Sequence, residues 1–458
     1  MKFWQGNFNE NLDENASRFI STFNADKRFY KHDVMGSIAH VTMLAEEKLI
    51  DERDAKIIQK TLTQIFYDIT SGKLTLENAN NVYEFIDNEL DNRLGNVAQN
   101  AAIGRTLVDR AALDARMYAL ELSNDLSNLL KDLISVLIQV AENYETTVLP
   151  FAYHGLNAQP TTLAHSLSAF AEMFLRDAER LNEFKNSASV MPLYSAYGTG
   201  TRLPVNRKRV AALLGFKAIT ANSADALSDV DYVYDFVNAS SIIMKHVATI
   251  CNTLINWQKD GYYNCDGSFN VDSTVMPQRD LPIVLETLKN KALRCKALYS
   301  TLCTLDTSEL AYSANLSAIN EITFEAEGYV KNSLNVLTAF IASLRFDEQT
   351  MLKTANAGFS TALDCVDYLL MRGADKSDAY EITGKICEFC AENGKRLDTL
   401  TAEDYQAISP LFEADIVSAM RVKNATRLRK NDGEPGDVAV RAEIRAIQRK
   451  LNKLFPED

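Results

Sequence analysis

A short polar loop directly before a long apolar segment carries the residue types of an anion-binding site. It reads Val271-Asp-Ser-Thr-Val-Met-Pro-Gln-Arg-Asp-Leu-Pro282, with a hydroxyl at Ser273 and a cation at Arg279. The backbone N–H groups at a helix N-terminus and the helix dipole both favour negative charge, so a helix beginning near Pro282 would complete such a site. An ordinary helix-capping loop has a similar composition, and the loop alone favours that simpler interpretation.

Two other motifs have less specific patterns. The pair Cys387-Glu-Phe-Cys390 has no second cysteine pair, and no two of the 5 His form an H-x-x-x-H pair, so we predict no metal site. We interpret these two cysteines as small buried hydrophobic residues. The segment Gly198-Thr-Gly-Thr-Arg202 is rich in glycine, but it lacks the preceding strand and the third glycine of a dinucleotide-binding loop. Nucleotide binding is therefore not favoured.

Long segments with helical apolar periodicity must position these residues. Apolar residues recur at i, i+3, i+4 and i+7, and also between these positions, which is typical of helices buried on most sides. Such helices predict a bundle, and their several apolar faces predict contacts between subunits. The expected helices cover residues 127–144, 161–184, 225–257, 283–304 and 319–344.

Three further stretches differ from this pattern. Residues 187–206, which are rich in Ser, Tyr, Gly and Pro, and residues 260–282 are expected to be loops, and loops of this length inside a helical domain tend to be functional. Residues 356–458 predict a separate small domain of shorter helices. We expect those helices to break at Gly373, Gly384, Gly394 and Pro410.

Composition limits the class of protein. The chain has 458 residues, of which 47% are hydrophobic, with only 18 Gly and 9 Pro, so we expect a mostly helical globular protein. The formal net charge of −13 disfavours nucleic acid and anionic membranes as partners. The 7 Cys are an odd, scattered set, which favours free thiols in a reducing compartment. No signal peptide or membrane span is evident, so we expect a cytoplasmic protein.

Several motifs resemble those of one enzyme family. The 271–282 loop is similar to Gly-Ser-Ser-x-Met-Pro-x-Lys-x-Asn-Pro, the signature of the fumarase and aspartase superfamily. Asp33-Val-Met-Gly-Ser-Ile-Ala-His40 resembles Asp-Ile-x-Gly-Ser-Ile-Ala-His of argininosuccinate lyases, and Asn222-Ser-Ala-Asp-Ala-Leu-Ser-Asp229 resembles their Asn-Ser-x-Asp-Ala-Val-Ser-Asp. These matches follow in order along nearly the whole chain. The chain is therefore identified as a divergent member of the argininosuccinate lyase family.

The resemblance implies an architecture. It is an all-α, three-domain fumarase/aspartase-like fold with a central long-helix bundle, which forms a twenty-helix core in a homotetramer. The corresponding domains here are an N-terminal helical domain at 1–106, the central bundle at 107–355 and the small helical domain at 356–458. The resemblance further implies a small dicarboxylate-containing substrate, no cofactor, and active sites shared between subunits.

The resemblance also assigns roles to individual residues. Ser273 aligns with the serine that abstracts the substrate proton, and Glu286 aligns with the glutamate that pairs with the catalytic histidine. That histidine is His154, within Phe151-Ala-Tyr-His-Gly-Leu-Asn-Ala-Gln-Pro160, and it reaches Ser273 from a different subunit. The expected substrate-binding residues are Ser37, Arg105, Thr274, Gln278, Arg279 and Tyr312.

The departures from the family pattern concern substrate binding. Where the family has His-Thr-Gly-Arg-Ser-Arg-Asn-Asp-Gln, this chain has Ala102-Ile-Gly-Arg-Thr-Leu-Val-Asp-Arg110, and the side chains of Leu107 and Val108 cannot hold an anion. In the family's Tyr-Asn-x-Asp-Leu-Gln-Glu-Asp-Lys stretch, Tyr312-Ser-Ala-Asn-Leu-Ser-Ala-Ile-Asn320 keeps only the tyrosine and the leucine. Argininosuccinate is therefore expected to be a poor substrate.

Three hypotheses follow for function. The first is a carbon–nitrogen lyase that releases fumarate, or a close analogue, from an N-substituted aspartate other than argininosuccinate, because Ser273, His154 and Glu286 all remain. The second is an inactive homologue that serves as a structural or interaction scaffold, because Arg279 replaces the signature lysine and Leu281 replaces the asparagine. The third is argininosuccinate lyase itself, in arginine biosynthesis.

Overall fold

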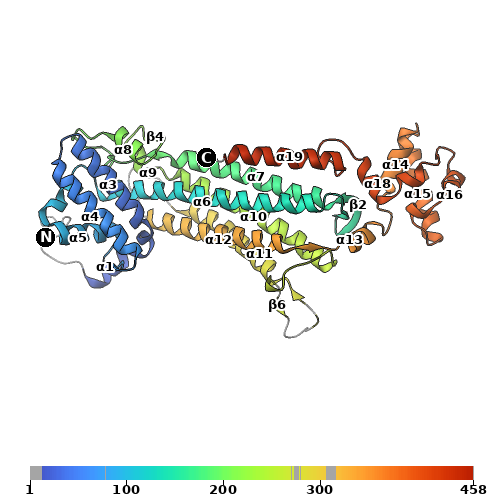
Figure 1. Cartoon of the computed structure of the whole chain (residues 1–458), viewed down its shortest axis with the longest axis horizontal. Helices are drawn as coiled ribbons and strands as arrows, with labels where there is room; N and C mark the ends of the chain where they lie inside the picture. The colour runs from blue at the N-terminus through green and yellow to red at the C-terminus, as the bar shows by residue number, and fades with distance from the viewer. Residues whose placement is uncertain are drawn as a thin grey trace. The chain divides into compact units, whose positions relative to one another are not determined.

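The computed structural model describes residues 13–77, 79–269, 271–272, 278, 280–305 and 316–456. Helices dominate these residues, so the predicted all-α class is confirmed (Figure 1). The chain separates into two compact units, each built from three stretches of sequence. Unit 1 comprises Met1–Leu126, Arg180–Ser240 and Cys295–Gly328, and unit 2 comprises Ser127–Glu179, Ser241–Arg294 and Tyr329–Asp458. The division into domains at 1–106, 107–355 and 356–458 stays a prediction.

Five long helices contribute residues to both units. They are α6 (Leu107–Asn143), α7 (Leu163–Ala188), α10 (Asp231–Lys259), α11 (Ile283–Thr304) and α12 (Leu316–Ser343). The predicted helix at 283–304 coincides with α11, and the segment at 127–144 is the second half of the longer α6. The segment at 225–257 is divided, because α9 (Asp225–Ser228) ends and Asp229 adopts an extended conformation before α10 begins.

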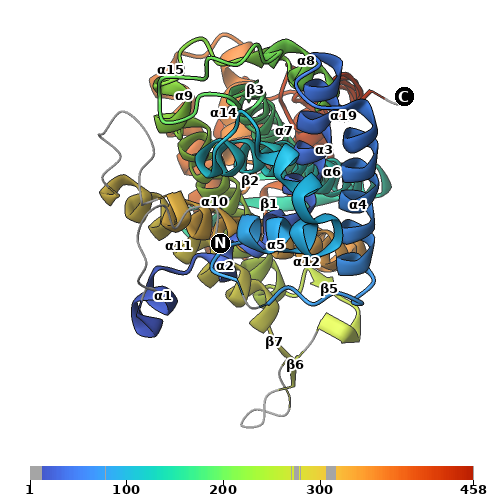
Figure 2. The ribbon, with the colours of Figure 1, turned by 90° about the vertical axis from the view of Figure 1, so that its left-hand side faces the viewer.

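Unit 1 also contains the N-terminal helices, of which α3 and α4 lie side by side (Figure 2). Its additional helices are α1 (Glu14–Ile20), α2 (Phe23–Asp26), α3 (Tyr30–Glu46), α4 (Glu52–Thr70), α5 (Val82–Leu94) and α8 (Arg207–Leu213), with the 3-10 helices η1 (Lys27–Phe29) and η2 (Gly95–Ala102). The short strands β3 (Val190–Met191) and β4 (Ala218–Ile219) pair in parallel. Phe29 packs against Tyr118 and Phe324, each at 5.5 Å between ring centroids.

Unit 2 contains an antiparallel hairpin and the C-terminal helices. The hairpin pairs β1 (Val148–Tyr153) with β2 (Leu156–Thr162). Shorter antiparallel pairs are β5 (Tyr263–Asn264) with β8 (Arg345–Phe346), and β6 (Val271–Asp272) with β7 (Asp280–Leu281). The remaining helices are α13 (Glu348–Ala355), α14 (Ala362–Met371), α15 (Lys376–Glu392), α16 (Ala402–Ile408), α17 (Ile416–Ala419), α18 (Val422–Leu428) and α19 (Asp437–Leu454), and the 3-10 helices are η3 (Gly267–Phe269) and η4 (Leu397–Thr399).

The C-terminal helices pack around a core of their own. Cys390 is fully buried in it, and Cys387 packs against it half-buried, as expected for small hydrophobic residues. Burial raises the pKa of both thiols, which keeps them protonated. Gly373 and Gly394 end helices with positive φ angles of 88° and 61°. The break expected at Gly384 is wrong, because this glycine lies inside α15, whose packing on the core outweighs a cost of about 1 kcal/mol for glycine in a helix.

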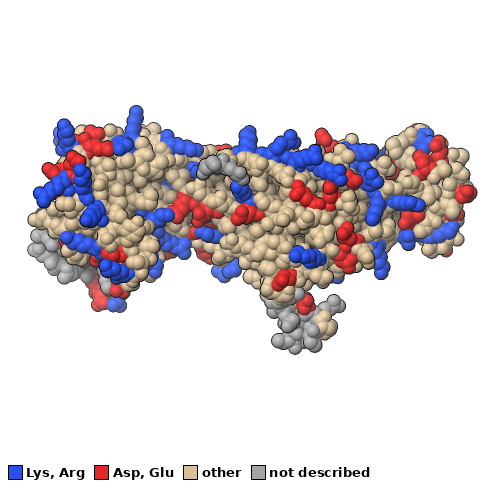
Figure 3. Space-filling model, in the orientation of Figure 1, with Lys and Arg blue, Asp and Glu red and all other residues tan. Residues whose placement is uncertain are grey.

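Helix α19 is amphipathic. Its apolar face includes the buried residues Val440, Ile444, Ile447 and Leu451. Lys and Arg side chains gather on the surface over the helix (Figure 3). Arg445 and Arg449, which belong to this helix, are exposed. None of the described helices is both long enough and apolar enough to cross a membrane.

A buried carboxyl in unit 1 predicts a pH-dependent stability. Asp26 is 7% exposed and accepts a hydrogen bond from Thr22. Burial, with a smaller contribution from Glu321, raises the pKa of Asp26 from 3.8 to about 6. The folded state therefore keeps this proton at a pH where the unfolded state has lost it, and the free energy of unfolding falls as pH rises from about 4 to about 6.

We expect Asp26→Asn to raise the free energy of unfolding at pH 7 by about 2–3 kcal/mol, since one pKa unit corresponds to about 1.4 kcal/mol. The gain should vanish below about pH 4, where the carboxyl is protonated in both states. Urea denaturation of wild type and variant at the two pH values measures this. If the variant gained the same free energy of unfolding at both pH values, the gain would not come from the ionisation of Asp26.

Candidate functional site

A buried polar face on α3 forms the centre of the candidate site in unit 1. Asp33, Ser37 and His40 follow one another at spacings of four and three residues, which places them on one side of the helix. Their exposed fractions are only 1%, 0% and 0%. Buried polar groups require partners, and several of these come from the segment that leads into α6.

Arg105 is the first of these partners. It lies in the turn between η2 and α6, where its Nη1 donates to Ser37 Oγ at 2.9 Å and its Nε donates to the Ala101 carbonyl at 3.0 Å. Burial, together with the charge of Arg110, lowers the pKa of Arg105 to about 10, so the guanidinium is still a cation at neutral pH. The structure therefore brings together two predicted substrate-binding residues, Ser37 and Arg105.

Arg110 is a second cation of the site and is buried, and the sequence reasoning missed it. Its Nε and Nη2 donate to the two oxygens of Asp33 at 2.8 and 2.7 Å, and its Nη1 donates to both oxygens of Asp87 at 2.9 and 2.8 Å. Burial opposes the charge, but the two carboxylates raise the pKa of Arg110 well above its usual value. The sequence contains one signal for this ion pair, because Arg110 stands where the family motif has a glutamine. An arginine that becomes buried at this position needs carboxylates nearby.

Burial shifts the pKa values of two further groups in this region in the direction that favours their neutral forms. Asp114 is 1% exposed, and neither of its oxygens accepts a hydrogen bond from a described residue. Burial and the neighbouring Asp33 raise the pKa of Asp114 well above its usual value. His40 Nδ1 lies 2.8 Å from the hydroxyl of Tyr194, and burial lowers the pKa of this imidazole. The cationic groups of this cluster are therefore Arg105 and Arg110.

Asp109 connects the start of α6 to the loop after β3. It is fully buried, and its Oδ2 accepts from the backbone N–H and the hydroxyl of Thr106 at 2.9 and 3.0 Å. The Asp109 N–H donates back to Thr106 Oγ1 at 3.2 Å, which completes a capping box. Its Oδ1 accepts from the N–H groups of Ser195 and Ala196 at 2.8 and 3.0 Å.

Next to Arg105, the chain departs from the family's polar residues. Leu107 begins α6 with 48% of its surface exposed, whereas Val108 is buried. Neither side chain can donate a hydrogen bond to an anion. The structure therefore leaves the side chain of Arg105 without the polar neighbours that the family motif has at these two positions.

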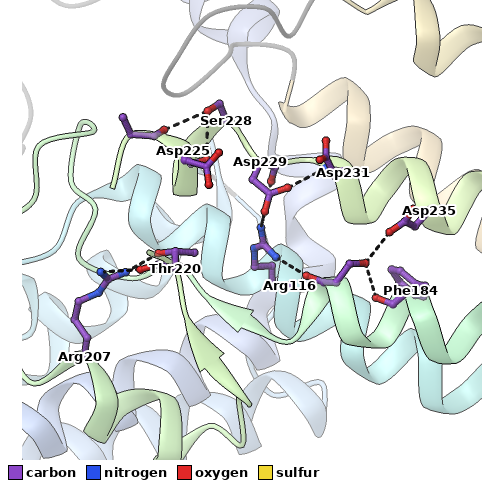
Figure 4. Close-up of polar contacts among 11 residues, drawn as sticks. Arg116, Phe184, Arg207, Thr220, Asp225, Ser228, Asp229, Asp231 and Asp235 are labelled. Carbon is purple, nitrogen blue, oxygen red and sulfur yellow. Dashed lines mark hydrogen bonds and ion pairs between the residues drawn. The ribbon is translucent and has the colours of Figure 1, made fainter. Parts of the chain in front are cut away.

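Another buried arginine anchors the 222–229 motif. Arg116 is 1% exposed, its guanidinium donates to Asp229, and it also donates to the Ser187 carbonyl at 3.1 Å (Figure 4). The guanidinium lies 4.6 Å from the ring centroid of Tyr232. These contacts hold the chain where α9 gives way to α10.

The predicted catalytic residues fall in unit 2 or outside the described residues. His154 is exposed at the tip of the β1–β2 hairpin with a φ of 51°, and Glu286 is exposed in the first turn of α11. Neither side chain makes a hydrogen bond to another described residue. Gln278 is exposed in a turn. Outside the described residues lie Ser273, Thr274, Arg279 and Tyr312. The convergence of these groups on one site stays a prediction.

Comparisons with known proteins agree on the family. A family model described as "Lyase" matches residues 6–296, and one described as "Argininosuccinate lyase C-terminal" matches residues 359–427. The argininosuccinate lyase of Acetivibrio thermocellus is 36% identical over 448 residues, covering 97% of this chain and 98% of the relative. The argininosuccinate lyase of Desulforamulus reducens is 35% identical over 458 residues, covering 99% of this chain and 100% of the relative.

Solved structures confirm the fold. EDDS lyase in complex with formate is similar with a TM-score of 0.82 at 24% identity, covering 94% of this chain and 87% of that one. Class II fumarase from Schistosoma mansoni is similar with a TM-score of 0.74 at 12% identity, and the match covers 92% of this chain and 94% of the fumarase chain. With relatives more than 30% identical over nearly its whole length, the chain belongs to the argininosuccinate lyase family of the fumarase/aspartase superfamily.

Proposed function

We propose that this protein is a carbon–nitrogen lyase that releases fumarate from an aminosuccinate by β-elimination. The observation that carries the proposal is the pairing of Arg105 with Ser37, which holds a half-buried cation at a fixed place against α3. A cation fixed in advance stabilises the charge that develops when a proton is removed beside a carboxylate. Membership of the argininosuccinate lyase family supports the same chemistry.

The remaining roles rest on the family resemblance. Ser273 would take the proton from the carbon beside the carboxylate, while Arg279 and the backbone from Thr274 to Gln278 would stabilise the resulting charge. His154, oriented by Glu286, would assist departure of the leaving nitrogen. This scheme assigns every step to side chains and backbone groups of the protein, with no cofactor or metal.

The site would be complete only in the assembled homotetramer, which stays a prediction. Support comes from the hairpin that carries His154, where Phe151, Tyr153 and Leu156 are 52%, 65% and 71% exposed. Large apolar side chains gathered at the tip of a hairpin are typical of a surface that another subunit covers. His154 would then reach Ser273 of a second chain.

Two candidate substrates have separate support. The relatives are named argininosuccinate lyases, which favours argininosuccinate, the substrate of the third hypothesis. An aminosuccinate with a less polar amine is the second candidate. It is favoured by Leu107, which is 48% exposed beside Arg105 where the family has an arginine.

We expect fumarate release from argininosuccinate, and we expect the double variant L107R/V108N to raise kcat/KM for this substrate at least about tenfold, because each restored polar contact contributes roughly 1.5–3 kcal/mol. Ultraviolet absorbance of fumarate measures the rate. Leu213→Arg, at an exposed position of α8, is the matched control and should change nothing.

A panel of N-substituted aspartates distinguishes the alternatives. Turnover of another aminosuccinate without turnover of argininosuccinate would establish the second candidate. Absence of fumarate release from every compound, by a folded and tetrameric protein, would contradict the proposal and favour the scaffold hypothesis.

A further inference from the structure

The loop between β3 and α8 has an unusual backbone. The φ angles of Tyr194, Ala196, Gly198 and Gly200 are positive, at 70°, 50°, 96° and 73°, and they alternate with described residues whose φ is not positive. Such alternation turns neighbouring N–H groups toward one side and forms a concave nest that binds anions. Left-handed geometry costs about 1–2 kcal/mol at a residue other than glycine, so Tyr194 and Ala196 must be held in place by other contacts.

The first nest of this loop already binds a carboxylate. The N–H groups of Ser195 and Ala196 donate to the same oxygen of Asp109, at 2.8 and 3.0 Å. A second tether is the hydroxyl of Tyr194, 2.8 Å from His40 Nδ1. Because Asp109 also caps the helix that follows Arg105, one buried side chain sets the position of both segments.

The second half of the loop has donors that remain available. The N–H groups of Gly198 and Gly200 both donate to the Ser195 carbonyl, at 2.9 and 3.0 Å. The backbone N–H groups of Thr199 and Thr201 donate to no residue that the structure describes. Both residues are exposed, and so is the next residue, Arg202, whose guanidinium makes no ion pair within the described part of the chain.

The loop lies beside the segment that carries Arg105. A Cβ on Gly104 would lie 3.1 Å from Cδ1 of Leu203, so the side chain of Leu203 packs directly against the backbone at Gly104. Gly104 itself has a φ of 79°, which favours glycine for a second reason. The available donors of the loop are thus in the same unit as Arg105, and they directly precede Leu203, whose side chain packs next to the Arg105 segment.

We propose that the loop is a carboxylate-binding site, in which the N–H groups of Thr199 and Thr201 and the guanidinium of Arg202 bind one carboxylate of the substrate. Asp109 is its positioning residue. The inference rests on the proposed function and adds a second carboxylate contact to the one at Arg105. It also accounts for the glycine-rich segment at 198–202, for which nucleotide binding was not favoured.

Titration of fumarate into the full-length protein, followed by calorimetry, tests the site without requiring turnover. We expect Arg202→Gln and Gly200→Ala each to raise the dissociation constant of fumarate at least about tenfold. Alanine at position 200 strains the backbone at its positive φ, yet its Cβ would meet nothing closer than the Tyr194 carbonyl oxygen at 3.8 Å, so the variant should fold. Lys208→Gln removes a neighbouring exposed charge on α8 and should change the constant less than about twofold.

A second pair of variants tests the role of Asp109. Asp109→Asn replaces one acceptor oxygen with an NH2 donor, so it should weaken fumarate binding. Asp404→Asn changes a similar capping box, with Thr401 in α16, and it should leave fumarate binding unchanged. If Asp109→Asn fails to fold, Gly200→Ala and Arg202→Gln still decide the question.

The proposal is overturned if wild type does not bind fumarate, if Arg202→Gln and Gly200→Ala bind it as wild type does, or if Lys208→Gln loses as much affinity as Arg202→Gln. Loop-dependent binding of fumarate without turnover of any aminosuccinate would contradict the proposed function and leave this site standing. Turnover of an aminosuccinate, with fumarate binding that does not depend on the loop, would support the proposed function and contradict this carboxylate-binding site.

Discussion

Ser273→Ala should lower the rate of fumarate release by a factor of roughly 10² to 10⁴, which is the usual contribution of a positioned general base. The physical reason is that the proton beside the carboxylate then has no acceptor, while the cations that stabilise the developing charge are unchanged. The loss should appear in kcat, with little change in KM. Ser268→Ala, an exposed serine close by in the sequence, is the matched control and should retain full activity.

Mixing two inactive variants tests whether His154 and Ser273 of one active site belong to different chains. If His154 and Ser273 of one site belong to different chains, refolding Ser273→Ala together with His154→Asn should produce some tetramers with an intact site and recover part of the activity. Retention of activity by Ser273→Ala alone would remove this serine from the mechanism. Failure of the mixture to recover activity, with tetramers formed, would place the two groups on one chain.

Arg110→Met should lower the free energy of unfolding by about 3–5 kcal/mol, because removal of one partner from a buried ion pair leaves the other charge uncompensated. Asp33 is 1% exposed and would lose both of its hydrogen bonds from Arg110. Asp87 is 39% exposed in its side chain, so water can replace Arg110 there. Urea denaturation measures the change.

Two variants give this stability prediction its controls. Arg18→Met removes an ion pair with Glu14 whose side chains are 74% and 78% exposed, and it should cost less than about 1 kcal/mol. The double variant R110M/D33N removes both buried charges, so it should be more stable than Arg110→Met alone. A loss below about 1 kcal/mol for Arg110→Met would show that the buried pair contributes little.

The sequence by itself determined the helical class, the family and the bounds of one long helix. Residues 283–304 were expected as a helix and form α11 with the same bounds, because apolar periodicity is a local property that depends on nearby residues. The helix break expected at Gly384 was wrong, because it relied on a local property where tertiary packing decides the outcome. The propensity of glycine is also local, and the packing of α15 on the C-terminal core overrides it.

Only the tertiary structure decided which polar groups meet. Arg105 reaches Ser37 across 68 positions of sequence, Arg110 reaches Asp33 across 77, and Asp109 reaches the loop at Ser195 across 86. A motif specifies the residue types, but such contacts form only when packing excludes water and each buried charge must then find a partner. Folding of α3 against the start of α6 thus determined the ion pair of Arg110 and the tethered loop, since no local pattern in the chain encodes either contact.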